Sequence, residues 1–299
     1  MSYESYSLFQ SPQIRWLDKL PKDWKVLRLK NAVGINLHPL NDSTDPDYEL
    51  QYVDIGNLTV NGLQNPPVRI RFEEAPSRAR RRVQPGDTII STVRTYLQAI
   101  AYFEKPPPNL VVSTGFAVLS PKSMIYPKFL YYLVRAPRFI NEVMAHSVGV
   151  SYPAISPSEL GSLLIWLPSL SEQKAIVQFL DQELAESNKI IDKNEILIQK
   201  LNEQRLAIIS RVVIHGLNPQ VPTQESSIPW LSELPAHWQT SRLKFISYIQ
   251  SGLTLGRKYD NSRNLVSRPY LRVANVQDSY LDLSTITEVD IPPEDTKRY

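Results

Sequence analysis

Six arginines fall within fourteen residues of the sequence, and only two acidic residues, Glu73 and Glu74, lie among them. A guanidinium group binds phosphate through several N–H donors, and it can pair in a bidentate manner with the O6 and N7 atoms of guanine. The cluster therefore predicts a contact with nucleic acid, although a merely solvated basic loop would have the same composition. Its members are Arg69, Arg71, Arg78, Arg80, Arg81 and Arg82.

Two further tracts carry polar side chains that could reach base edges or the sugar-phosphate backbone. One lies at the expected end of a strand, and the other surrounds Gly149, which would allow close approach to a backbone. Each tract by itself could equally be a solvated loop. The candidate DNA-binding residues are Arg94, Thr95, Tyr96 and Gln98 in the first tract, and Ser147, Ser151 and Tyr152 in the second.

No motif of a known catalytic class accompanies these tracts. A phosphate-binding G-x-x-x-x-G-K-[ST] loop and a G-x-G-x-x-G loop are absent, and residues 65–68 (N-P-P-V) lack the aromatic residue that completes the amino-methyltransferase motif. The four histidines show no i, i+4 pair, so a zinc site is not expected. The sequence predicts a non-catalytic protein that binds no metal and no cofactor of its own.

Composition and charge place the chain among ordinary globular proteins. The absence of cysteine excludes disulfides and a cysteine nucleophile and fits the reducing cytosol, so a cytoplasmic location is expected. No segment approaches the roughly 18 apolar residues of a membrane span, so no membrane contact is expected. Residues 1–170 hold 18 Lys and Arg against 14 Asp and Glu, an excess of +4, whereas the whole chain carries +3. The positive charge therefore belongs to the first domain.

The chain contains an internal repeat. Residues 14–30 (IRWLDKLPKDWKVLRLK) align with residues 228–244 (IPWLSELPAHWQTSRLK) at an offset of 214, with nine identities in seventeen positions that include two tryptophans. One domain type therefore occurs twice. The second copy ends before any equivalent of Pro85-Gly86-Asp87, so we expect it to be partial. The expected organisation is a first domain over residues 1–170, a spacer helix over 171–216, a linker over 217–229 and a partial second domain over 230–299.

The first domain alternates short β-branched runs with turn residues, which predicts a strand-rich α+β fold. Helices are expected over residues 127–135 and 137–145, because each range begins with a proline that suits a first helical turn. Strands are expected over residues 26–30, 48–55, 68–72, 88–93, 99–103, 110–113, 116–119 and 163–167.

A long helix should follow, because residues 171–214 contain neither proline nor glycine, and Ser169 with Glu172 forms a capping-box pattern. At about 1.5 Å per residue this helix would be roughly 66 Å long. Its heptad seam predicts packing against another helix, either from a second copy of the chain in an antiparallel homodimer or, alternatively, by folding back onto its own domain. The expected coiled-coil residues are Val177, Leu180, Leu184, Ile191, Asn194, Ile198, Leu201, Ile208 and Val212.

In several ordered motifs the sequence resembles the specificity subunit of type I restriction-modification systems. The matching segments are L-P-x-x-W at 20–24 and 234–238, P-G-D-x-I-x-S-x-V-R at 85–94, S-x-G-F-x-V-L-x-P at 113–121, S-V-G-x-x-Y-P-A-I at 147–155, and the L-P-x-L-x-E-Q region within 160–181. The similarity covers nearly the whole chain but ends inside the second recognition domain.

This resemblance implies a division of labour among subunits. Each target-recognition domain would read half of a bipartite site in double-stranded DNA, and the helix would act as a coiled-coil spacer that docks methyltransferase subunits. Those subunits would bind S-adenosylmethionine, and restriction subunits would use ATP and Mg. A chain with one complete half would form a homodimer.

Two other interpretations remain open from the sequence. The chain could be the specificity segment of a fused restriction-methylation enzyme, or a solitary nuclease, although the absent catalytic motifs disfavour both. It could also be a coiled-coil scaffold that does not touch DNA, which would leave the arginine cluster unexplained.

Overall fold

The computed structural model describes residues 8–11, 19–60, 62–249, 251–253, 264–278 and 280–297. They belong to two compact units, one up to Leu197 and one from Ile198 onward, each described here by itself. In the first unit the elements are β1 (Phe9–Gln10), β2 (Leu20–Pro21), β3 (Lys25–Arg28), α1 (Leu29–Ala32), β4 (Val33–Ile35), β5 (Glu49–Val53), β6 (Leu58–Thr59), β7 (Gly62–Leu63), β8 (Val68–Arg71), β9 (Ala79–Arg82), β10 (Asp87–Ser91), β11 (Ile100–Phe103), β12 (Leu110–Ser113), β13 (Phe116–Pro121), α2 (Pro127–Arg135), α3 (Pro137–Ala145), α4 (Pro157–Ser162) and β14 (Leu164–Leu167). Helix α5 (Leu170–His215) then runs from the first unit into the second.

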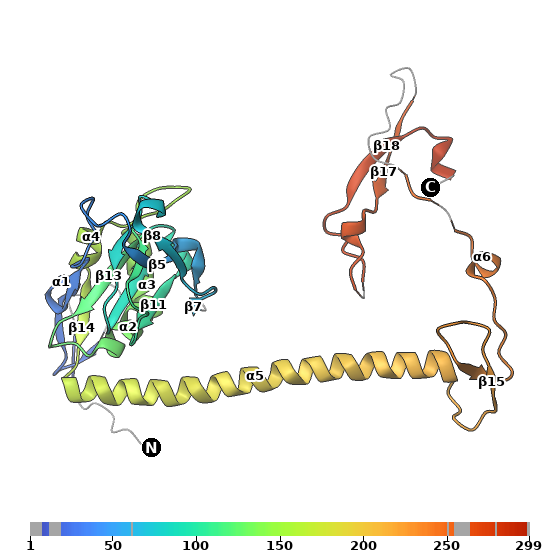
Figure 1. The fold of residues 1–299 in the computed structure, drawn as a ribbon, viewed down its shortest axis with the longest axis horizontal. Coiled ribbons are helices and arrows are strands. Elements are labelled where there is room, and N and C mark those ends of the chain that lie inside the picture. Colours follow the sequence, from blue (N-terminus) through green and yellow to red (C-terminus); the bar gives the residue numbers. More distant parts are fainter. Residues whose placement is uncertain are drawn as a thin grey trace. The chain divides into compact units, whose positions relative to one another are not determined.

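Two four-stranded sheets form the body of the first unit (Figure 1). One has the order β11-β10-β13-β4 and is antiparallel throughout. The other has the order β8-β5-β12-β9, in which β12 runs parallel to β5 and antiparallel to β9. A separate pair, β3 with β14, joins the start of the domain to its end. The strand-rich α+β fold expected from the sequence is confirmed.

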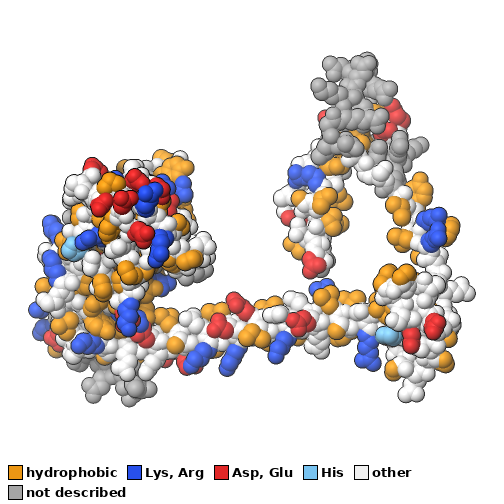
Figure 2. Space-filling view, in the orientation of Figure 1, with side chains coloured by type: hydrophobic (Ala, Val, Ile, Leu, Met, Phe, Trp, Pro, Cys, Tyr) orange, Lys and Arg blue, Asp and Glu red, His pale blue; other side chains and the backbone are white. Residues whose placement is uncertain are grey.

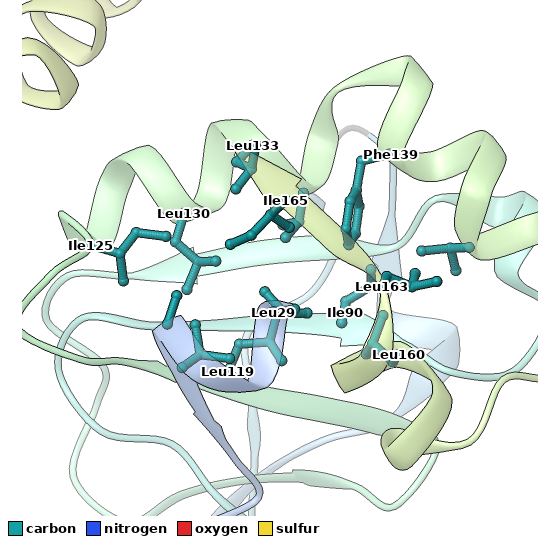
Figure 3. Close-up of a cluster of buried hydrophobic side chains, with 14 of the residues drawn as sticks. Leu29, Ile90, Leu119, Ile125, Leu130, Leu133, Phe139, Leu160, Leu163 and Ile165 are labelled. Atoms are coloured by element: carbon teal, nitrogen blue, oxygen red, sulfur yellow. The ribbon is translucent and has the colours of Figure 1, made fainter. Parts of the chain in front are cut away.

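The period-two alternation of the strands divides the core into layers. In β13, Phe116 and Val118 face a cluster that lies between the two sheets, whereas Ala117 and Leu119 face the cluster that α2 and α3 cover. Figure 3 shows Leu130 of α2 pointing toward the sheet side of this second cluster. A third cluster, which includes Leu50 and Val111, lies in the β8-β5-β12-β9 sheet. In each sheet, the buried faces are therefore the faces that carry the apolar side chains.

The expected elements agree closely with those observed, with a few additions. Helices α2 and α3 have the expected bounds, and both begin with proline. Strand β9 was not expected, because its sequence, A-R-R-R, has no β-branched or aromatic residue. Helix α4 was also missed, although Ser156 and Glu159 form a complete capping box at its start. Short elements of this kind depend on neighbours that the local pattern does not show.

The first turns of α5 are packed against the domain that precedes them. The buried side chain of Gln173 accepts a hydrogen bond from the Tyr126 amide at 2.7 Å, and it donates to the carbonyl oxygens of Met124 at 3.1 Å and Pro168 at 2.9 Å. Glu172 accepts a hydrogen bond from the Trp24 indole at 3.0 Å. The helix therefore begins at a fixed place on the domain.

An ion pair extends this contact by two turns. Asp181 of α5 lies 2.7 Å from Lys128 and accepts a hydrogen bond of 2.5 Å from the Tyr132 hydroxyl, both on α2. Partial burial raises the pKa of this carboxyl, but the hydrogen bonds from Lys128 and Tyr132 outweigh that effect and hold the pKa below its usual range. Because the folded-state pKa is lowered, the pair stabilises the fold at neutral pH, and this contribution is lost as the pH falls through that pKa.

These contacts correct one predicted coiled-coil residue. Val177 is 4% exposed and belongs to the core that α2 and α3 cover, so it packs on its own domain rather than on a partner helix. The reason is that the seam and the docking face coincide over the first turns: Gln173, Val177 and Asp181 recur at intervals of four. Beyond these turns the apolar seam is open to solvent, with Ile191 52% and Ile198 59% exposed. Figure 2 shows hydrophobic side chains recurring between charged ones along α5.

The second unit contains the end of α5 and short elements that repeat the beginning of the first unit. They are β15 (Thr223–Glu225), β16 (Glu233–Pro235), α6 (Leu243–Ile246), β17 (Val266–Tyr270) and β18 (Thr287–Ile291). Leu29 and Ala32 of α1 are fully buried, whereas Leu243 and Ile246 of α6 are exposed. The second copy therefore has the local structure of the first without its core. No helix in the described ranges is both long and apolar enough to cross a membrane.

Replacing Gln173 should loosen the junction between α5 and the domain. In Gln173→Ala the buried Tyr126 amide and two carbonyls lose their partner, and one unsatisfied buried group costs about 1–3 kcal/mol. We expect the free energy of unfolding, measured by urea denaturation, to fall by at least that amount. Gln182→Ala, on the exposed surface of the same helix, is the matched control and should change stability by about 0.5 kcal/mol or less. Equal urea midpoints for Gln173→Ala and Gln182→Ala would show that Gln173 does not stabilise this junction.

Candidate nucleic-acid interface

Arg71, at the end of β8, is surrounded by carboxylates. Its guanidinium lies 3.2 Å from Asp47, 2.8 Å from Glu73 and 2.6 Å from Glu74. The hydrogen bond to Glu74, followed by the charge of Glu73, raises the pKa of Arg71 further above its usual value. Figure 2 shows acidic and basic side chains intermingled around β8. The positive charge of Arg71 is therefore locally neutralised.

Arg78 and Arg80 also have partners on neighbouring segments. Arg78 donates to Asp54 at 2.7 Å and to the Tyr52 hydroxyl at 3.3 Å. The guanidinium of Arg80 lies 4.7 Å from the centre of the Phe72 ring and 3.4 Å from Asp42. Three members of the arginine cluster therefore hold the sheet and its loops together, which is a structural use of their charge.

Arg81 and Arg82 are part of strand β9 and are only partly exposed. Each has a buried Nε atom with no hydrogen-bond partner among the described residues. Burial lowers the pKa of Arg81. Arg69, on β8, is exposed and forms no salt bridge with any described residue. Five of the six arginines therefore belong to β8 and β9, which lie on opposite edges of one sheet, and Arg78 directly precedes β9. The cluster does not form a single open patch.

The two polar tracts that are separated in sequence lie together in the structure. The hydroxyls of Thr95 and Ser147 are 2.9 Å apart. The Arg94 amide donates to the Pro153 carbonyl at 2.8 Å, and Ala154 forms bridges with both Val93 and Val148. These bonds join the loop after β10 to the loop after α3. The structure thus brings together the candidate residues of both tracts. Thr95 is only 5% exposed, so its hydroxyl joins the two loops and is not available to a partner, contrary to the prediction.

Arg94 occupies an unusual position within this surface. Its φ of +50° is left-handed, a conformation that costs free energy for a residue other than glycine and that recurs at functional sites. Its guanidinium lies 4.6 Å from the centre of the Tyr152 ring, and it forms no salt bridge with any residue that the structure describes. Gln98 is also left-handed, with φ of +53°, at the end of the single 3-10 turn that carries Tyr96. The guanidinium donors are therefore oriented by the ring and available to an external acceptor.

The exposed rim of this surface includes residues that the sequence did not single out. Leu97 is 46% exposed, and Val148 and Val150 are more exposed still. Tyr96, Ser151 and Tyr152, which were predicted, are exposed as well. Apolar side chains at a loop tip are typical of a surface that contacts a partner, but in sequence they look the same as core residues. We name this surface, made by residues 93–98 and 147–154, the loop-pair surface.

No group of three or more His, Cys, Asp or Glu in the described part of the chain could hold a metal ion. The loop-pair surface instead offers a cation, amides, hydroxyls and phenol rings. Such an arrangement can bind an extended anionic partner through hydrogen bonds, without covalent chemistry.

The sequence and fold were compared with known proteins. The family profile described as "Type I restriction modification DNA specificity domain" matches residues 21–200. Over 182 residues the chain is 25% identical to the type I restriction enzyme EcoKI specificity subunit of Escherichia coli (strain K12), an alignment that covers 61% of this chain and 37% of that protein. It is 23% identical over 285 residues to the type I restriction enzyme MjaIX specificity subunit of Methanocaldococcus jannaschii, covering 87% of this chain and 60% of that one.

A solved structure is also similar. The HsdS subunit from Thermoanaerobacter tengcongensis has 30% sequence identity and a TM-score of 0.55, over 68% of this chain and 52% of that one. This chain therefore spans about half of the solved relative and less than two thirds of both specificity subunits.

The geometry of the loop-pair surface should depend on Gly149. Its φ is +117°, and a Cβ atom there would lie 3.1 Å from the Tyr152 carbonyl oxygen. In Gly149→Ala we expect the loop to open, at a cost of about 1–3 kcal/mol. Hydrogen exchange of the Val148, Ala154 and Arg94 amides should then be about tenfold faster or more. Val150→Ala, in the same loop and fully exposed, should leave exchange unchanged. Slow exchange in both variants would refute this account of the loop.

Proposed function

This chain belongs to the type I restriction-modification DNA specificity family, and we propose that its first domain recognises one half of a bipartite sequence in double-stranded DNA. The match to the family profile over residues 21–200 supports this proposal. The supporting observation within the fold is Arg94, a cation without a carboxylate partner that is held against Tyr152 beside the hydroxyls of Thr95 and Ser147. Arg71, Arg78 and Arg80 are paired with carboxylates, and Arg81 and Arg82 each have a buried Nε atom. Within the cluster, Arg69 alone is exposed without a salt bridge among the described residues, so the loop-pair surface is the better candidate for the reading surface.

The nature of the contact follows from the position of the guanidinium. Stacking on a ring fixes the plane of the group and reduces the entropy lost on binding, which favours in-plane, bidentate acceptors. The O6 and N7 atoms of guanine and the oxygens of a phosphate are both such acceptors. Gln98 and Tyr96 could then contact neighbouring base edges, while Arg69 could contact phosphate.

We propose that the chain supplies recognition while partner subunits supply the reaction. The similar proteins are named as specificity subunits of restriction enzymes. In this arrangement methyltransferase subunits bind S-adenosylmethionine, restriction subunits use ATP and Mg, and α5 docks them. The exposed charged surface of α5 offers room for such contacts.

We propose further that α5 pairs with the α5 helix of a second copy. An isolated amphipathic helix of this length is stable only when its apolar seam is covered. Asn194 near the middle of the seam would set the register. The seam consists of Leu184, Ile191, Asn194, Ile198, Leu201 and Ile208, all exposed, together with the partly buried Leu180 and Val212.

One alternative is favoured by a specific observation. Arg71, Arg78 and Arg80 are paired with carboxylates, which leaves less positive charge for DNA and would suit a coiled-coil scaffold that does not bind DNA. The specificity segment of a fused restriction-methylation enzyme would have the same fold in its first domain. Direct DNA-binding measurements on the loop-pair surface distinguish the scaffold from the recognition subunit.

Removing the Arg94 side chain should weaken DNA binding. From a random-sequence duplex library, the wild-type chain with its methyltransferase partner should select a motif. Arg94→Ala should lower affinity by about 1–3 kcal/mol, which is about 5- to 150-fold in Kd. Loss of preference at a single guanine would identify a base contact, and a uniform loss with a smaller salt dependence would identify a phosphate contact. Arg71→Ala is the control, because its charge is already neutralised. Unchanged affinity in Arg94→Ala would contradict the assignment of the loop-pair surface.

A charge in the exposed seam should disrupt self-association. The wild-type chain is expected to be a dimer at micromolar concentration in sedimentation equilibrium. Ile198→Asp places an unpaired carboxylate in the buried seam and should weaken the dimer by at least tenfold. Lys193→Asp introduces the same side chain outside the seam and should have little effect. A monomeric wild-type chain would refute the homodimer.

A further inference from the structure

The repeated L-P-x-x-W segment forms a small hairpin in the first unit. Strand β1 pairs with β2, and the Lys22 amide donates to the Leu8 carbonyl at 3.1 Å. Trp24 follows in a turn, in which its amide donates to the Pro21 carbonyl at 3.1 Å. Gln10 donates from its side chain to the Trp24 carbonyl at 2.7 Å. We call residues 8–10 and 20–24 the first hairpin.

The second unit contains an equivalent hairpin at the offset of 214, with a closely matching set of hydrogen bonds. Strand β15 pairs with β16, the Ala236 amide donates to the Pro222 carbonyl at 2.8 Å, and the Trp238 amide donates to the Pro235 carbonyl at 2.9 Å. The Gln224 side chain donates to the Trp238 carbonyl at 3.0 Å, as Gln10 does to Trp24. We call residues 222–225 and 233–238 the second hairpin. Sequence identity between the repeats thus extends to a shared hydrogen-bond pattern.

The two hairpins contact opposite ends of α5. The tryptophan of the first hairpin donates its indole N–H to Glu172 in the first turn of α5. The tryptophan of the second hairpin lies against the last turn, where a cavity of about 420 Å³ is lined by Val212, His215, Gly216, His237 and Trp238. Gly216, with φ of +76°, ends the helix, and a Cβ atom there would be 3.5 Å from Trp238 Cζ2. One motif therefore binds a helix start in one unit and a helix end in the other.

From this comparison we propose that the first hairpin also binds a helix end, namely residues Val212–Gly216 of a second copy of this chain. The first hairpin has the same backbone and the same tryptophan as the hairpin that already binds this segment. When two α5 helices lie antiparallel, the end of one lies beside the start of the other, where the first hairpin is located. This inference rests on the proposed homodimer and specifies where its ends meet.

The exposed surface and the hydrogen-bonding groups of the first hairpin fit this occupant. Leu8 and Phe9 expose 61% and 54% of their surface, which a docked helix end would cover. The residue equivalent to His237 is Asp23, which is exposed, so an acidic residue replaces the histidine that shares the cavity with His215. The Asp23 carboxylate can accept a hydrogen bond from a ring N–H of His215, and this contact offsets the unfavourable interaction of a carboxylate with the negative end of the helix dipole.

The proposal has a further consequence, because the same helix end cannot hold two hairpins on one face. In the dimer the first hairpin of one copy competes with the second hairpin of the other for Val212–Gly216. The second hairpin therefore acts as an internal competitor of self-association. Weakening it should strengthen the dimer.

Site-directed cross-linking tests the contact directly, because the chain has no cysteine of its own. Full-length chains that carry only Asp23→Cys are mixed with chains that carry only His215→Cys and treated with a short bismaleimide. We expect a cross-linked heterodimer. Glu195→Cys, exposed in the middle of α5, replaces His215→Cys in the negative control and should give at least tenfold less product. A single chain with both His215→Cys and His237→Cys should cross-link internally and serves as the positive control.

The outcomes distinguish a failure of the proposed hairpin contact from a failure of the proposed homodimer. A dimer in sedimentation without the Asp23–His215 product would overturn the hairpin contact alone, whereas a monomer would overturn both. As a second test, Trp238→Ala removes the competitor and should raise both the association constant and the cross-linked yield severalfold. A weaker dimer in Trp238→Ala would show that the second hairpin supports association, contrary to the proposal.

Discussion

The attachment of α5 to its domain is the constraint on which the rest of the first unit depends. The buried side-chain amide of Gln173 forms hydrogen bonds with three backbone groups. Each of these groups would cost free energy if it were buried without a partner. Val177 continues the contact in the apolar core, and Asp181 closes it with an ion pair to Lys128. Because the helix start is fixed, the loop-pair surface has a fixed orientation relative to the helix axis. The proposed role of α5 as a spacer requires this fixed attachment.

The arginines show how charge is used in two ways within one domain. Arg71, Arg78 and Arg80 lie close to carboxylates that come from other segments, and these pairs connect loops to the sheet. Exposed pairs of this kind contribute little to stability, but they reduce the positive potential that a duplex would meet. Arg94 differs because an aromatic ring, rather than a carboxylate, holds it. Its charge therefore remains available to an anionic partner.

The two units each contain a hairpin with the same local hydrogen-bond pattern. Both keep a glutamine-to-carbonyl hydrogen bond beside a tryptophan, and both contact an end of α5. Leu243 and Ile246 of α6 are exposed, whereas the equivalent Leu29 and Ala32 of the first copy are buried in its core.

The sequence by itself determined the α+β class, the bounds of α2 and α3, most strands, the long helix and the repeat, because these depend on periodicity, proline position and local identity. Family membership could also be predicted from ordered motifs. The tertiary structure decided which charges are free: Asp54 and Asp42 lie 24 and 38 positions from the arginines they pair with, and no local pattern reveals such pairs. It also decided that Val177 belongs to the core and that Arg94 and Tyr152, 58 residues apart, stack on each other. Pairing and burial arise from contacts between segments distant in the chain, and only the folded chain brings those segments together.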